Sequence, residues 1–422
     1  MLKRRICAAL IIPPEIYHIP ETGGGAWIRF FKVYKYISNY LDLKFIVIIG
    51  NKNRFYRYLY GRESFFLQFI IYLKYLVSII FNNRMFKSSD MIIYPAENYP
   101  QYMILSYLAA RLYNKPLIIF TNTVPVIGSV MITEDNVIDL CNIKNILHFA
   151  HRFKKSIFFK LSYAIVWYFA LKILKDKRVF LVALIPHVSA KIKHLNMASN
   201  IIEVYPGNGI DVFESCQLDS RKKILDALFV SSTLHPLKGI YDLIPIWYIV
   251  SRNMPVAKLG ILGKVPGELL KMLEKLNYLI KKYNLQNNII ILNDPKCTIK
   301  HEKVMKVMQQ AKIFLYPSRK DVWPLVIGEA VACSVPVVTY ALPSLKYAYG
   351  ACPLVFFHEV GDYKAMAATI ERLLNNYDTL VNEAWEKSKE YFKRYTWERA
   401  AKLELIAYLH ALKRFYKQYA KN

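Results

Sequence analysis

The sequence has few of the residues that mark small cross-linked, repetitive or disordered proteins. Its 422 residues include 6 cysteines, which lie far apart without a C-x-x-C pair, so neither a zinc knuckle nor a disulfide framework is expected. Glycine (15) and proline (19) are scarce and hydrophobic residues make up 54%, which excludes collagen-like, low-complexity and disordered chains. At roughly 100 to 200 residues per domain, we expect two or three folded domains.

Acidic residues are also scarce relative to basic ones. The chain has 31 Asp and Glu against 58 Lys and Arg, a formal net charge of +27. Such a surface favours an anionic partner, which could be nucleic acid, an acidic membrane face or a phosphorylated substrate. The charge does not choose among these three, but the sequence contains no recognised RNA- or DNA-binding motif.

Hydrophobic runs of membrane-spanning length are absent as well. Residues 65–81 and 157–174 fall short of the ~20 residues that a span needs, and each run contains lysine. The basic start and the apolar run after it are similar to a signal peptide, but Pro13-Pro14 ends the run without a cleavage site, so a first buried strand is predicted. With no disulfide pattern either, we expect a cytoplasmic protein.

Residues 145–178 mix His, Lys and Arg with Phe, Trp and Tyr. This composition suits a helix in a membrane interface, with aromatic rings at the headgroup level and cations near anionic lipid. It suits a core-facing helix with a solvated basic side equally well. Peripheral association with the inner face of the cell membrane is therefore one of two open interpretations.

Short apolar runs alternate with longer amphipathic stretches along the whole chain, which predicts parallel strands joined by crossover helices. The turn Pro206-Gly207-Asn208-Gly209 and the polar stretch after it mark a domain boundary. We expect an α/β chain with two Rossmann-like, doubly wound domains facing a cleft, residues 1–206 and 223–395, and a C-terminal helix, 396–422, that crosses back. The predicted strands are 5–12, 43–49, 91–94, 117–121, 179–185, 201–204, 226–231, 257–262, 288–292, 313–316, 335–339 and 354–357.

Two acidic residues eight positions apart, Asp321 and Glu329, lie in the most informative segment, Tyr316 to Val338. The segment predicts a strand end, a polar loop with Asp321, an apolar helix with Glu329 and a new strand. An acid in such a loop can bind sugar hydroxyls, and one two turns further on can accept hydrogen bonds from a ribose. By spacing alone, two solvated carboxylates beside a buried helix are the more frequent explanation.

Two glycine-containing turns are further candidates. Lys238-Gly239 lies between a predicted strand and a helix, where a helix N-terminus and a lysine together favour an anion, although a surface lysine gives the same pattern. Gly23-Gly24-Gly25 follows the first predicted strand and precedes a helix, so it is either a place where the backbone approaches a ligand or a tight connection.

Taken in order, these segments resemble the retaining glycosyltransferases of family 4 (glycosyl transferases group 1), which have the GT-B fold. Glu329-Ala330 and Pro336-Val337-Val338 match the family wording P-S-x-x-E-G-F-G-L-x-x-x-E-A-x-A-x-G-x-P-V-V, and Lys238-Gly239 matches the end of G-R-L-x-x-x-K-G. Residues 205–211 resemble the Asn-Gly-Ile-Asp segment that closes the first domain, and residues 395–398 resemble the Phe-Ser-Trp-Glu element before the last helix; packing roles are expected for both. Asp321 replaces the first Glu, Val322-Trp323-Pro324 replaces Gly-Phe-Gly and Ser334 replaces a Gly.

The resemblance implies a role for each matching position. Glu329 would bind the ribose of a nucleotide sugar, and Lys238, Gly239 and Thr233 would lie at the donor diphosphate. The residues implied at the donor sugar are Asp321, Val322, Trp323, Pro324 and Leu325, although Pro324 has no backbone N–H to offer. Gly23, Gly24 and Gly25 would lie near the diphosphate or the acceptor.

Thr233 departs from the family pattern, because an arginine usually stands there. Its loss removes one of two cations on the leaving group, worth roughly 3 kcal/mol of transition-state stabilisation in a closed site. Other basic side chains could substitute for it. The candidates are Lys264, Lys296, Arg319 and Lys320.

The resemblance thus implies a nucleotide-sugar-dependent hexosyltransferase that retains anomeric configuration and uses no metal or cofactor. Its acceptor would be a glycan, either lipid-linked or a surface glycan precursor, and an anionic membrane surface is a further expected partner, whereas nucleic acid is not. Two alternatives stay open. The change at Thr233 and the replaced glycines point to a catalytically silent scaffold with this fold, and the net charge points to a nucleic-acid-binding protein.

Overall fold

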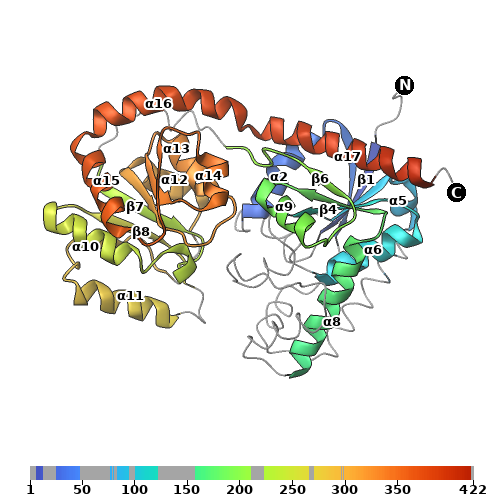
Figure 1. Cartoon of the computed structure of the whole chain (residues 1–422), viewed down its shortest axis with the longest axis horizontal. Helices are drawn as coiled ribbons and strands as arrows, with labels where there is room; N and C mark the ends of the chain where they lie inside the picture. Colours follow the sequence, from blue (N-terminus) through green and yellow to red (C-terminus); the bar gives the residue numbers. More distant parts are fainter. Residues whose placement is uncertain are drawn as a thin grey trace. The chain divides into compact units, whose positions relative to one another are not determined.

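The computed structural model describes residues 6–12, 25–47, 77, 79, 83–94, 100–121, 157–210, 223–265, 270–295, 297 and 299–419. The chain divides into two compact units: unit 1 comprises residues 1–208 and 397–422, and unit 2 comprises residues 209–396. Within the described residues, each unit has a six-stranded sheet whose neighbouring strands are all parallel, with helices around it (Figure 1). The predicted α/β class with two doubly wound sheets is confirmed.

Unit 1 has the strand order β2-β1-β3-β4-β5-β6. Strands β3, β4 and β5 are buried along their whole length, as expected for a parallel sheet covered on both faces. The strands are β1 (Ile6–Ile12), β2 (Leu41–Val47), β3 (Met91–Tyr94), β4 (Leu117–Thr121), β5 (Val179–Ala183) and β6 (Ile201–Glu203). The helices are α2 (Gly25–Ile37), α5 (Asn83–Ser88), α6 (Pro100–Leu112), α8 (Ile157–Leu174), α9 (Pro186–His194) and α17 (Trp397–Tyr419).

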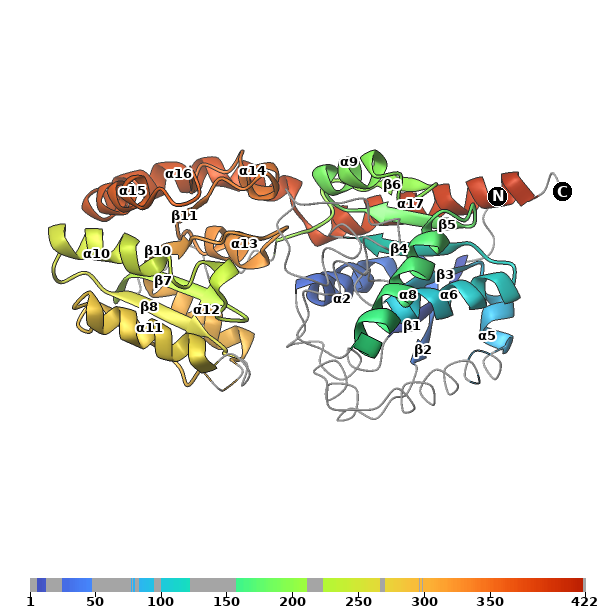
Figure 2. The same ribbon diagram turned by 60° about the horizontal axis from the view of Figure 1, so that its bottom comes forward.

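The C-terminal helix α17, drawn in red, lies beside α2 in unit 1 (Figures 1 and 2). A buried ion pair fastens the two helices: Arg29 Nη2 donates to Glu404 Oε2 at 2.7 Å, and the two side chains are 3% and 1% exposed. Arg29 Nε also donates to the carbonyl of Gly207 at 2.6 Å, and the buried Tyr408 hydroxyl donates to Glu404. The last helix is thereby tied both to α2 and to the segment that follows β6.

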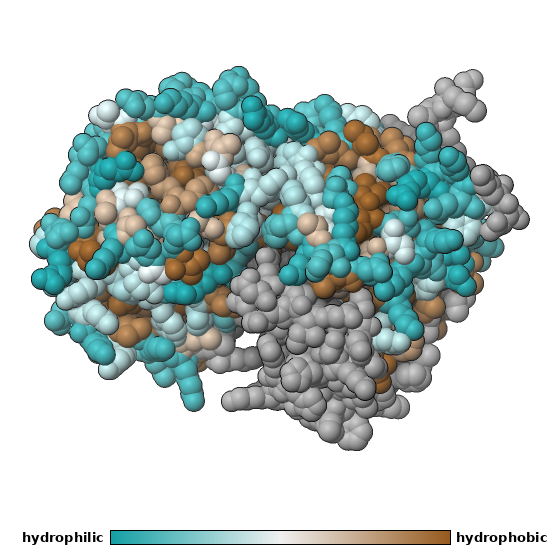
Figure 3. Space-filling model, viewed as in Figure 1, coloured by the Kyte–Doolittle hydropathy of each residue, from teal (hydrophilic) through white to brown (hydrophobic). Residues whose placement is uncertain are grey.

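Unit 2 has the strand order β12-β11-β10-β7-β8-β9. The strands are β7 (Leu225–Ser231), β8 (Leu259–Gly263), β9 (Ile289–Ile291), β10 (Ala311–Tyr316), β11 (Val337–Tyr340) and β12 (Val355–His358). The helices are η3 (Pro236–Lys238, a 3-10 turn), α10 (Leu243–Asn253), α11 (Leu270–Lys282), α12 (His301–Gln309), α13 (Leu325–Ala332), α14 (Pro343–Tyr349), α15 (Tyr363–Asn375) and α16 (Tyr377–Arg394). Hydrophilic side chains cover the outer side of α16 in the face shown in Figure 3.

The strand order of unit 2 fixes where a ligand can bind. The first strand, β7, lies between the second, β8, and the fourth, β10, so the order reverses between β7 and β10. In open α/β sheets, ligands bind outside the carboxyl ends of the strands at such a switch point. The loops that follow β7 and β10 are those that carry Lys238 and Asp321.

Within the described part of the chain, no helix is long and apolar enough to cross a membrane. The run 157–174 is helix α8, which buries one side against unit 1 through residues such as Trp167 and Leu171. Its other side leaves Ile165 and Phe169 exposed. The run 65–81 lies almost entirely outside the described residues.

Candidate functional site

The loops that follow β7 and β10 are hydrogen-bonded to each other. The backbone N–H groups of Arg319 and Lys320 both donate to the carbonyl of Leu237, at 2.9 and 3.2 Å, and the Ser318 hydroxyl donates to the same oxygen at 3.3 Å. Leu237 lies in η3, directly after β7. These hydrogen bonds join the two loops at the switch point of unit 2 and hold their side chains in place.

Gly239 is required by the close approach of these loops. Its φ is +78°, in the left-handed region, and a Cβ there would lie 1.9 Å from the carbonyl oxygen of Pro317. The turn before it is capped by His235, whose Nδ1 accepts a hydrogen bond from Leu237 N at 3.1 Å. Burial, and then the charge of Lys238, lower the pKa of His235, which favours the neutral imidazole that can accept this bond.

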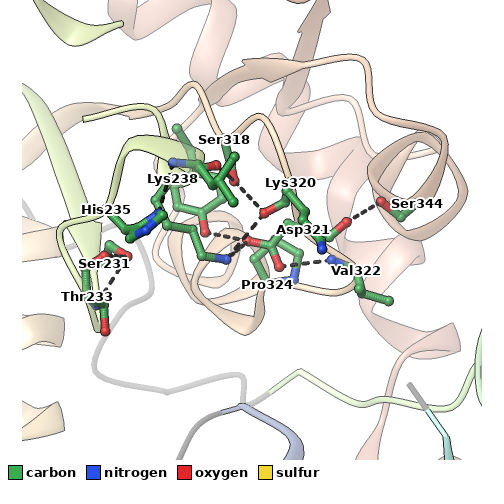
Figure 4. Close-up of polar contacts among 12 residues, drawn as sticks. Ser231, Thr233, His235, Lys238, Ser318, Lys320, Asp321, Val322, Pro324 and Ser344 are labelled. Carbon is green, nitrogen blue, oxygen red and sulfur yellow. Dashed lines mark hydrogen bonds and ion pairs between the residues drawn. The ribbon is translucent and has the colours of Figure 1, made fainter. Parts of the chain in front are cut away.

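The two motifs identified separately in the sequence meet in a single ion pair. Lys238 Nζ lies 2.6 Å from Asp321 Oδ2, and it also approaches the Lys320 carbonyl at 3.5 Å (Figure 4). The Asp321 carboxylate has two further donors, the Tyr316 hydroxyl on Oδ2 at 2.6 Å and Val322 N on Oδ1 at 2.9 Å. The lysine side chain remains 31% exposed and the aspartate 12%.

Tyr316 is a site residue that the sequence analysis missed. It ends β10, and its ring stacks on those of Phe314 and Phe229. Burial, and then the charge of Asp321, raise the pKa of the Tyr316 hydroxyl well above its ordinary value, so it stays protonated and donates to the carboxylate. In the sequence it looks like any aromatic residue at a strand end, and its only distinguishing signal is its position five residues before Asp321.

Glu329 lies on α13, the helix that follows the Asp321 loop. Its side chain is 15% exposed, and Oε1 lies 3.8 Å from His301 Nε2 at the start of α12. Burial raises the pKa of Tyr349 well above its ordinary value, and the charges of Glu329 and Asp321 both add to this rise. Both predicted acids therefore favour the protonated form of the Tyr349 hydroxyl.

The residues between the two acids build the start of α13. Pro324 is the N-cap of the helix, and its carbonyl accepts a hydrogen bond from the Tyr349 hydroxyl at 2.8 Å. Trp323 is buried against the rings of Tyr347, Tyr349 and Tyr395. The indole therefore anchors the loop within unit 2, while Leu325, the first helical residue, is partly exposed.

The basic residues considered as substitutes near Thr233 differ in what they can reach. Arg319 is held by Asp242, with Nε to Oδ2 at 2.6 Å and Nη2 to Oδ1 at 3.0 Å, a bidentate pair that raises its pKa. The backbone carbonyl of Lys264 accepts a hydrogen bond from Leu234 N at 2.8 Å, next to Thr233 itself. Lys320 belongs to the Asp321 loop, and Lys296 lies outside the described residues.

The predicted glycine loop of the first domain is only partly described. Gly25 is the first residue of α2, whereas Gly23 and Gly24 lie outside the described residues. Across the part of the chain that the structure describes, no three His, Cys, Asp or Glu side chains gather as a metal site would require. Cys297, Cys333 and Cys352 of unit 2 form no disulfide bonds with one another.

Comparison with known proteins finds similarity that includes nearly all of unit 2. Residues 217–395 match the family model for glycosyl transferases group 1. The capsular polysaccharide biosynthesis glycosyltransferase CapM of Staphylococcus aureus is 27% identical over 227 residues, which are 50% of this chain and 57% of CapM. The D-inositol 3-phosphate glycosyltransferase of Mycolicibacterium smegmatis is 25% identical over 51% of this chain and 48% of its own. The matches span about half the length of these curated relatives.

Solved structures share the fold over nearly the whole chain. A glycosyltransferase from Rickettsia africae gives a TM-score of 0.65 at 14% identity, covering 97% of this chain and 99% of its own. Sucrose-phosphate synthase from Thermosynechococcus elongatus gives 0.66 at 14% identity (99% and 100%), and Anabaena HepE in complex with UDP gives 0.64 at 13% identity (97% and 100%). The fold is that of the GT-B glycosyltransferases, as the sequence resemblance implied.

Proposed function

We propose that the protein is a glycosyltransferase that moves a hexose from a nucleotide-sugar donor to an acceptor with retention of anomeric configuration. The observation that carries this proposal is the contact between Lys238 and Asp321 at the switch point of a glycosyl transferases group 1 domain. Two motifs that are 83 positions apart form one polar site there, with Glu329 on the helix that follows. A pair of unrelated surface charges would not be expected at the place where doubly wound sheets bind nucleotides.

Each group has a role that fits its position. The Lys238 ammonium would bind the donor diphosphate and stabilise the charge that builds up on it as the sugar departs. Asp321 would accept hydrogen bonds from the sugar, and Glu329 those of the ribose. Because protein cations and loop amides neutralise the diphosphate in this scheme, no metal is required, and the rate of transfer should persist in excess EDTA.

The acceptor proposed here is a glycan precursor carried on a lipid at the cytoplasmic face of a membrane. Three features support it: the net charge of +27, the exposed Ile165 and Phe169 on α8, and the exposed Lys172 on the same helix. Exposed apolar side chains next to cations are the combination that binds an anionic membrane interface.

The proposal is tested by measuring release of nucleoside diphosphate from a panel of UDP-, GDP-, ADP- and TDP-sugars. We expect release with one donor class, and a fall of about 100-fold or more in kcat/KM in a Glu329→Gln variant, because the partly buried charged acceptor for the ribose hydroxyls becomes a neutral amide. Glu302→Gln, which changes an exposed acid in the first turn of α12, should leave the rate unchanged. No release with any donor would favour the silent scaffold, and the NMR coupling constant of the product's anomeric proton tests retention.

A further inference from the structure

The proposed function assigns Lys238 to the donor diphosphate and Asp321 to the donor sugar, yet these two side chains form an ion pair with each other. One oxygen of the carboxylate, Oδ2, receives both the lysine and the Tyr316 hydroxyl at 2.6 Å, and the other receives Val322 N at 2.9 Å. A diphosphate that is to bind the Lys238 ammonium must therefore compete with a carboxylate that is already in hydrogen-bond contact with it.

The pair is not needed to hold the two loops together. Three donors of residues 318–320 already converge on the Leu237 carbonyl, and Gly239 packs directly against Pro317. The neighbouring pair of Arg319 and Asp242 shows what a structural ion pair looks like in this unit, because it is bidentate and Tyr340 and Tyr363 add further bonds to the same carboxylate. Lys238, by contrast, makes a single contact to its partner's carboxylate and keeps 31% of its side chain exposed to an incoming ligand.

We propose that Asp321 is a built-in counter-ion that competes with the donor diphosphate for Lys238, so that binding of the phosphate and release of the aspartate are one exchange of partners. After the exchange, the carboxylate keeps the Tyr316 hydroxyl and Val322 N as donors and is available to the sugar. The inference rests on the proposed function and adds a positioning role for Tyr316. Asp321 thereby weakens binding of the nucleotide alone. It makes a favourable contact only when the nucleotide carries a sugar.

The test compares the affinities of UDP, GDP, ADP and TDP for the full chain and for Asp321→Asn, by isothermal titration calorimetry. Removing the competing charge should tighten binding of the nucleotide that binds the unchanged protein by roughly tenfold, while sugar transfer becomes slower. Asp226→Asn is the matched control, since Asp226 pairs with Lys312 at 2.9 Å elsewhere in unit 2, and it should not change the affinity. In a Lys238→Met background the gain from Asp321→Asn should vanish, because the contested cation is gone.

A second variant keeps both charges and changes only the support of the carboxylate. Tyr316→Phe removes one donor from Oδ2, so releasing Asp321 from Lys238 costs more, and nucleotide affinity should fall several-fold. The inference is overturned if a nucleotide binds but Asp321→Asn binds it no more tightly, if Asp226→Asn gives the same gain, or if the gain survives in the Lys238→Met background. In those cases the proposed function stands. If none of the four nucleotides binds any of these proteins, the proposed function fails and this inference with it.

Discussion

The buried ion pair between Arg29 and Glu404 allows a quantitative test of how the C-terminal helix stabilises unit 1. Replacing Arg29 with methionine keeps the volume of the side chain but leaves the Glu404 carboxylate, 1% exposed, without its counter-charge, and it removes the donor to the Gly207 carbonyl. Breaking a buried pair from one side costs about 3–5 kcal/mol. At about 2–4 °C per kcal/mol for a unit of this size, the melting midpoint of unit 1 should fall by roughly 10 °C.

Differential scanning calorimetry measures this change, and the transition of unit 2 serves as the internal reference. The matched control is Glu398→Gln, which breaks the pair with Lys402 on the same helix, where both side chains are 56% exposed; the midpoint should not move. In the double variant Arg29→Met/Glu404→Gln the uncompensated charge is gone and the glutamine carbonyl can still accept from Tyr408, so much of the loss should be recovered. A shift for Arg29→Met no larger than that of the control would mean that the Arg29–Glu404 pair does not stabilise unit 1.

Three further predictions concern Gly239, Phe169 and His235. Gly239→Ala should lower the free energy of unfolding by more than about 2 kcal/mol, because the cost of a positive φ and the clash with Pro317 add together. Gly361→Ala, at φ +89° with no atom within 4 Å of the added Cβ, should lower it by only about 1 kcal/mol. Equal losses in urea unfolding would contradict the contact between Gly239 and Pro317. Phe169→Ser should weaken co-sedimentation with phosphatidylglycerol vesicles, because it removes an exposed apolar side chain of α8. Val256→Ser, at a more exposed apolar residue of unit 2, should leave co-sedimentation unchanged. An equal effect of both changes would mean that α8 does not bind the membrane. The folded state lowers the pKa of His235, so the stabilisation from its cap should be present above the ordinary histidine pKa of ~6.5 and lost as the pH falls below that value. The melting midpoints of the protein and of His235→Ala should therefore differ less at pH 5 than at pH 7. A difference that does not shrink would count against the cap.

The strands were predictable because buried parallel strands consist of nearly continuous apolar runs. All twelve predicted strands occur among the described residues, but their bounds depend on pairing as well as composition. For example, β2 was predicted at 43–49 and spans Leu41–Val47, because Leu41 pairs with Ile6 at the start of β1. Composition shows where a strand is apolar, whereas the register with its neighbour decides where it begins.

The candidate site was predictable as separate pieces. Lys238 and Asp321 were each identified from a local motif, but their contact depends on β10 pairing with β7, which no local pattern contains. Tyr316 was missed for the same reason, since only the folded loop brings the Asp321 carboxylate to its hydroxyl. Arg319 was considered a possible substitute cation, and only the structure shows that Asp242 holds it.

The proposed binding of a nucleoside diphosphate to unit 2 through Lys238 can be measured with a thermal-shift panel of UDP, GDP, ADP and TDP. We expect one nucleotide to raise the melting midpoint of the protein and of Lys312→Met, whose lysine is paired with Asp226, and to raise that of Lys238→Met much less. If no nucleotide stabilises the protein, or if Lys238→Met responds as strongly as Lys312→Met, then Lys238 does not bind a nucleoside diphosphate.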